Sequence, residues 1–154
     1  MDPKIINALK ASGADANLIK ALTSDYASRY WAAPSNFVAG ALGQLAATGG
    51  TGADNVTNPD TDGFALITHQ CFISTGLFYM QLTPTDIGAG LFTAPVIADT
   101  LLSILDQPWR LPVPILLRGS DSLRINLVNA NGAVANDVYL TTIGYRLIPR
   151  NRMC

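Results

Sequence analysis

The segment 111–149 constrains the fold more than any other part of the chain. Between Leu123 and Leu127, apolar and polar residues alternate strictly, so that Leu123, Ile125 and Leu127 leave the same side of the backbone. A strand with one buried face has this period of two, because successive side chains leave opposite faces of the pleat. Asn, Asp, Gly and Ser residues that favour turns stand on either side of it. We therefore predict two or three consecutive antiparallel strands in this segment.

Two further β-prone runs lie upstream, at 64–75 and 77–83. In the second run, alternation places Phe78, Met80 and Leu82 on one face. In the first run, the same rule opposes two sets of side chains: Phe64, Leu66 and Thr68 on one face, and Ala65, Ile67 and His69 on the other. Both runs are predicted to be strands of the same domain.

The prolines of the segment 108–114 indicate a position at a sheet edge or at the start of a strand, because proline cannot donate to a central ladder. About six to eight short strands separated by turns are typical of a sandwich or a barrel. The predicted fold class is therefore mainly β.

Residues 2–31 show the signals of two helices. Asp2 can cap the first and Pro3 fits its first position, while Asp15 can cap a second helix that continues through Tyr26 and Tyr30. Isolated helices of this length are marginal in water, so they must pack on another surface. The predicted organisation has three parts: a helical arm at 1–40, a Gly/Ala/Asn-rich connection at 41–63, and a β-domain at 64–154.

The chain has unusually few charges. Asp, Glu, Lys and Arg make up 14% of the residues, whereas roughly 25% is ordinary. The net charge of -1 gives little repulsion between molecules. These values favour a subunit that hides much of its surface against copies of itself or a partner, and they argue against nucleic-acid binding.

Aromatic and arginine residues are the candidates for such contacts, because aromatic anchors and arginine are enriched at interfaces. The aromatic residues could instead cover the base of the β-domain, and the arginines could belong to a solvated tail. The candidate interface residues are Tyr26, Tyr30, Trp31, Phe37, Trp109, Arg150 and Arg152.

No group of residues predicts catalysis, a metal or a cofactor. The segment 58–63 imitates the first half of a calcium loop, but the twelfth position would be His69 and not glutamate. His69 and Cys71 share a strand face without a second histidine or a glutamate to complete a site. The Gly-rich segments 49–52 and 86–90 lack the lysine of a phosphate loop. We expect a protein that is not an enzyme.

No apolar stretch approaches the ~20 residues of a membrane span, and the N-terminal residues lack the pattern of a signal peptide. Cys71 and Cys154 are too few for a disulfide framework, which favours a reducing compartment. Neither a membrane nor a nucleic acid is an expected partner.

Four segments, 93–96, 107–114, 122–129 and 138–147, together resemble small jelly-roll structural proteins of tailed bacteriophages. The shared features are a proline-flanked strand, a short alternating strand that ends in Asn, and a last strand that ends in Gly-Tyr-Arg. The resemblance covers about residues 64–149. It implies an antiparallel jelly-roll β-sandwich in the virion, such as a capsid cement or decoration protein.

The implied partners are the major capsid protein and further copies of the chain, as a dimer or trimer. The implied location is the capsid surface, after synthesis in the host cytoplasm. Two alternatives stay open: a receptor- or carbohydrate-binding module of a head fibre or tail, with Trp109 and Tyr79 stacking on a sugar, or a neck or tail adaptor.

Overall fold

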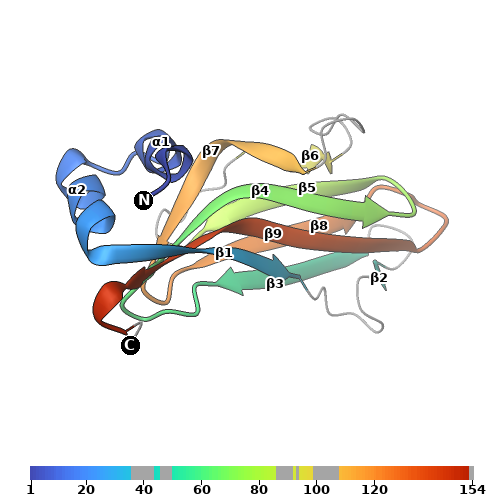
Figure 1. Ribbon diagram of the computed structural model, residues 1–154. Coiled ribbons are helices and arrows are strands. Elements are labelled where there is room, and N and C mark those ends of the chain that lie inside the picture. The colour runs from blue at the N-terminus through green and yellow to red at the C-terminus, as the bar shows by residue number, and fades with distance from the viewer. Residues whose placement is uncertain (36–43, 46–49, 86–91, 93, 99–107, 153–154) are drawn as a thin grey trace.

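The protein is mainly β, with two antiparallel sheets and two short helices (Figure 1). The computed structural model describes residues 1–35, 44–45, 50–85, 92, 94–98 and 108–152. The helices come first in the chain: they are α1 (Pro3–Ala11) and α2 (Ala16–Asp25). A short 3-10 turn, Arg150–Arg152, follows the last strand.

The strands form two sheets in which every pairing is antiparallel. The first sheet has the order β1 (Tyr26–Pro34), β9 (Asn136–Pro149), β4 (Phe64–Ser74) and β7 (Trp109–Arg118), and the two-residue β2 (Gln44–Leu45) pairs with the start of β9. The second sheet has the order β3 (Thr51–Thr57), β8 (Ser122–Asn129), β5 (Phe78–Pro84) and β6 (Val96–Ile97).

The main core lies between the two sheets. The alternation predicted for β8 is confirmed, because Leu123, Ile125 and Leu127 are all fully buried. The alternation predicted for β5 is confirmed in the same way. These side chains pack against apolar residues on the inner face of the first sheet, including Ile67 and Leu140. Each fully buried aliphatic or aromatic side chain contributes about 1.5–3 kcal/mol.

The two helices cover one end of the outer face of the first sheet (Figure 1). Their caps are as predicted: the Asp2 carboxylate accepts a hydrogen bond from the Lys4 amide at 2.7 Å, and Asp15 accepts one from Leu18 at 2.9 Å. The helices bury an apolar cluster against the sheet, made of Ile5, Leu9, Leu22, Leu66 and Leu147. No helix in the described ranges is long and apolar enough to cross a membrane.

The prediction of helix beyond Asp25 is wrong. Residues 26–34 form β1, which pairs with β9 along its whole length, from Tyr26 opposite Pro149 to Pro34 opposite Thr141. The four-residue spacing from Tyr26 to Tyr30 fits one face of a strand as well as one face of a helix. Aromatic residues favour strands, and the exposed edge of β9 supplies the hydrogen bonds that a helix would otherwise make.

Part of the predicted connection at 41–63 belongs to the β-sandwich itself, because Thr51–Thr57 form β3 at the edge of the second sheet. Only Gly52 and Val56 of this strand are buried. A single apolar side chain leaves no visible alternation in the sequence, so the pairing with β8 decides the structure.

A bulge interrupts the alternation predicted for β4. The register shifts between Ile67 and His69. Against β9 the shift adds one residue to β4, whereas against β7 it adds three residues to β7, because Ile67 pairs with Ile115 and His69 with Arg110. His69 therefore lies on the outer face, opposite Ile143 and Arg110, and not on the inner face with Ile67. The prediction for the proline-rich run is confirmed, because β7 occupies an edge of the first sheet.

Candidate interaction surface

Beyond the helices, no described residue covers the outer face of the first sheet around Ile73 and Tyr139. Ile73 and Tyr139 are directly opposite each other on β4 and β9, and they are 75% and 56% exposed. Alternate residues of β1, β4 and β9 continue this surface, which we call the open face: Tyr30, Ala32, Pro34, Cys71, Ile73, Tyr139, Thr141 and Ile143. None of these side chains is an acid, a lysine or an arginine. These side chains form an uncharged strip across three strands, and Asp137, the next outward residue of β9, lies at its end.

The predicted aromatic residues do not gather in one cluster. Tyr26 lies beside the helices with its ring edge-on to Phe64, at a centroid distance of 5.6 Å. Tyr30 is 67% exposed and contacts Tyr145 edge-on at 6.2 Å, so it borders the open face. Trp31 follows on the opposite side of β1 and packs against the core between the sheets. Phe37 lies outside the described residues.

Trp109 belongs to the core. It is 8% exposed, and its ring stacks on Phe92 at a centroid distance of 6.3 Å. It therefore offers little area to a partner or to a sugar, and Tyr79, at 38% exposure, stands on the other sheet. Arg150 and Arg152 are exposed, and Arg152 is paired with Asp62.

Ile73 and Tyr139 were missed by sequence reasoning, although a signal existed. Each is an apolar residue that points outward from its strand. The inward-pointing neighbours are apolar too, since Phe72, Val138 and Leu140 all pack on or in the core. A strand that is apolar on both faces is covered on both faces in most proteins. This signal would have identified the open face.

The open face invites comparison with known proteins. Searches against protein-family models, curated proteins and solved structures find no match for this chain. The surface is therefore interpreted from its own residues.

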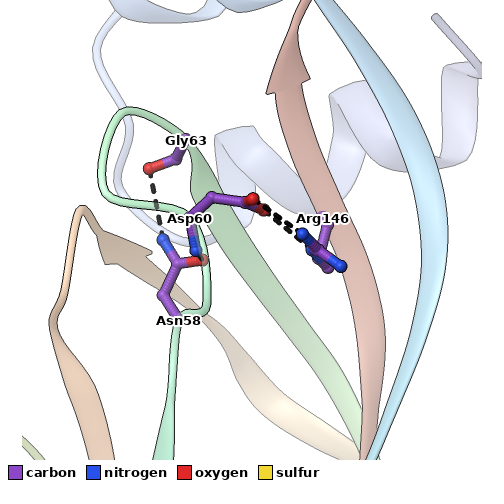
Figure 2. A network of polar contacts seen from close by, with 4 residues as sticks. All are labelled: Asn58, Asp60, Gly63 and Arg146. Carbon is purple, nitrogen blue, oxygen red and sulfur yellow. Dashed lines mark hydrogen bonds and ion pairs between the residues drawn. The ribbon is translucent and has the colours of Figure 1, made fainter. Parts of the chain in front are cut away.

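The segment that imitates a calcium loop is the turn between β3 and β4. Its polar contacts, which we call the clasp, hold this turn and join it to β9 (Figure 2). The buried Asn58 amide donates to the Gly63 carbonyl at 3.2 Å, and its oxygen accepts from the Asp60 amide at 3.1 Å. The Asp60 carboxylate then accepts from Nε and Nη2 of Arg146, at 2.7 and 2.6 Å. This bidentate pair raises the pKa of Arg146, chiefly through the hydrogen bonds.

Both acids of this loop have protein cations as partners. Asp60 pairs with Arg146 and Asp62 with Arg152, so the carboxylates that a cation would need are already engaged. In the described ranges, no three His, Cys, Asp or Glu side chains are grouped as metal ligands. The loop is best explained as a structural link between its turn and the C-terminal strand.

Replacing Asp60 with asparagine should lower the free energy of unfolding by about 1–2 kcal/mol, because it leaves a partly buried guanidinium without its charged, bidentate partner. The Asp60 and Arg146 side chains are only 19% and 32% exposed. Asp62→Asn is the matched control, since the Asp62–Arg152 pair is more than half exposed and solvent screens it. Urea unfolding followed by tryptophan fluorescence measures both. If the free energy of unfolding fell equally in the two variants, the Asp60–Arg146 pair would not be the important contact of the clasp.

His69 and Cys71 share one strand face, as predicted, and the structure shows that it is the outer face. His69 contacts the Thr68 hydroxyl through Nδ1 at 2.8 Å, and among the described residues no hydrogen bond joins it to the thiol. Burial raises the pKa of Cys71, which disfavours the thiolate. This arrangement does not activate the cysteine as a nucleophile.

Proposed function

We propose that the chain is a jelly-roll structural protein of a tailed-phage virion, which acts as a capsid cement or decoration protein. The strand order supports the jelly roll. With the short β2 set aside, β1 pairs with β9, β3 with β8, β4 with β7 and β5 with β6. The first strand thus pairs with the last, and the pairing proceeds inward in nested order. A long antiparallel hairpin that folds over into two sheets requires this order.

The open face is the single observation that carries the functional proposal. A monomeric protein rarely leaves a continuous apolar patch in water, and such patches mark interaction sites. Here Tyr30, Ile73 and Tyr139 are each more than half exposed on one sheet face. The low charge of the whole chain, 14%, supports the same interpretation. The proposed partners are a second copy of the chain and the major capsid protein.

A cement protein of this kind binds across the junctions between shell subunits. Loosening the shell then also requires breaking the contacts of the cement protein. If it binds only the mature shell, it stabilises that state by mass action. A sheet face suits this role, because its hydrogen-bonded backbone is already ordered and little conformational entropy is lost when it docks.

The proposal is tested by measuring the copy number and the location of the chain in purified particles. A cement protein is expected on the head, in numbers comparable with the major capsid protein. Quantitative mass spectrometry and labelling with a specific antibody measure both quantities. A few copies per particle, confined to a vertex or tail, would favour an adaptor, and absence from particles would refute the proposal.

Replacing Ile73 with aspartate should weaken association at the open face by at least about 30-fold, or about 2 kcal/mol, because it places an unpaired charge in the contact. The fold should be unchanged, since this side chain is 75% exposed. Val134→Asp is the matched control: Val134 is 60% exposed but lies in the turn between β8 and β9. Sedimentation equilibrium measures self-association, and sedimentation with particles measures binding. If the Ile73 variant associated as strongly as the parent chain, the open face would be excluded as the surface of association.

A further inference from the structure

A cleft of about 400 Å³ separates α1 from the outer face of the first sheet, next to β4 and β7. Helix α1 contributes Lys4 and Asn7, β4 contributes His69, β7 contributes Arg110 and β9 contributes Tyr145. The side chains come from four different elements, so the fold and not a local motif brings them together. The bulge in β4 is essential, because it turns His69 to this face.

The charges of this cleft are of one sign. Lys4 and Arg110 supply an ammonium and a guanidinium, and no Asp or Glu is among the lining residues that the structure describes. The described ion pairs involve neither of these two cations. Because like charges repel each other, such a group is stabilised when an anion binds between them.

The hydrogen bonds at the cleft fix the tautomer of His69. Thr68 is 3.5 Å from the Ile143 carbonyl, to which its hydroxyl can only donate. We therefore assign the Nδ1 atom of His69 as the donor in the 2.8 Å contact with that hydroxyl. Nε2 is then the atom that takes a second proton, which turns the imidazole into a third cation. Asn7 and Tyr145 add neutral donors.

We propose that this cleft binds a small oxyanion, a phosphate- or carboxylate-bearing molecule, between Lys4, His69 and Arg110. The guanidinium is suited to bidentate contact with such a group, and the lysine acts as a point charge. This site is separate from the open face and does not depend on the proposed capsid role.

Anion binding and His69 protonation should be linked. Two effects lower the pKa of His69 below its ordinary value near 6.5: burial is the larger, and the positive charge of Arg110 is the smaller. The titratable groups that face it are Lys4 from α1, Arg110 from β7 and Tyr145 from β9. A bound anion reverses the sign of the local field and raises this pKa. Binding should therefore strengthen as the pH falls through the His69 titration.

The chain has a single histidine, so one imidazole signal in the NMR spectrum reports on the cleft. We would titrate the full-length protein with pH in sodium chloride, sodium sulfate and sodium acetate at equal ionic strength. Sulfate stays a dianion across this range and stands for a phosphate group. We expect a pKa below about 6.5 in chloride and a rise of at least about 0.5 in an oxyanion that binds. A larger rise in sulfate indicates a phosphate-type ligand, and a larger rise in acetate indicates a carboxylate.

Arg110→Gln should abolish the difference between oxyanion and chloride. Arg118→Gln is the matched control, since Arg118 is exposed at the other end of the same strand, roughly 25 Å away at about 3.3 Å per residue. Its variant should keep the full difference. Lys4→Gln serves as a second test variant on α1. Equal pKa values in all three salts, or equal loss in the Arg110 and Arg118 variants, would overturn the proposal.

Discussion

Alanine at Gly144 is expected to lower the free energy of unfolding by about 3 kcal/mol or more, the largest effect of any single substitution considered for this chain. A Cβ at this position would lie 2.9 Å from the Leu66 carbonyl carbon and 3.0 Å from the Ile67 Cα, and in still closer contact with the Leu66 carbonyl oxygen. All three atoms belong to the backbone of β4. No side chain can rotate away, so the two strands must separate.

The position of Gly144 explains this sensitivity. It pairs with Ile67 of β4 at the bulge and with Trp31 of β1 on its other side. Separating β9 from β4 there would disturb the centre of the first sheet and the bulge that orients His69. The expected result is a lower urea midpoint together with a change in the His69 NMR signal.

Gly132→Ala is the control for this prediction, because a Cβ at Gly132 would meet no heavy atom within 4 Å. Its free energy of unfolding should stay within about 0.5 kcal/mol of the parent value. Urea unfolding followed by tryptophan fluorescence compares the two variants. If Gly144→Ala were as stable as Gly132→Ala, the close packing of β4 on β9 would be wrong.

The strands of the C-terminal half could be predicted from the sequence because one face of each is buried. Leu123, Ile125 and Leu127 alternate with polar residues, and the structure buries all three. β1 and β3 could not be predicted in this way. β1 is a strand because β9 offers it a free edge, and β3 has only Val56 as a buried apolar side chain. Both strands depend on residues about 70 to 120 positions away, which no local pattern encodes.

The candidate surface was harder to predict than the fold. Aromatic residues indicate an interface or a core with equal strength, and Trp109 and Trp31 contact the core while Tyr30 faces solvent. The cationic cleft was beyond sequence reasoning, because strict alternation places His69 on the wrong face. The register shift after Ile67 brings it beside Arg110, with one extra residue in β4 against β9 and three in β7 against β4. Such a register shift cannot be recognised from the spacing of apolar and polar residues in the sequence.

A chain that begins at Tyr26 should fold, whereas a chain that begins at Ser35 should not. The first truncation removes both helices and uncovers Leu66 and Leu147, which should cost about 3 kcal/mol and expose a new apolar patch. The second also removes β1, whose nine residues all pair with β9 and whose Trp31 and Ala33 cover the core. β1, which falls within the predicted N-terminal arm of residues 1–40, is thus a strand of the first sheet.

Near-ultraviolet circular dichroism and urea unfolding distinguish the two truncations. We expect a cooperative transition for the chain that begins at Tyr26 and none for the chain that begins at Ser35. Cooperative unfolding of the shorter chain would mean that β1 is dispensable. The chain that begins at Tyr26 also separates the possible interfaces, because Ile73 and Tyr139 lie beyond the helices and keep their exposure. If that chain still binds particles, and the Ile73→Asp substitution removes the binding, the sheet face makes the contact; if it no longer binds, the helices do.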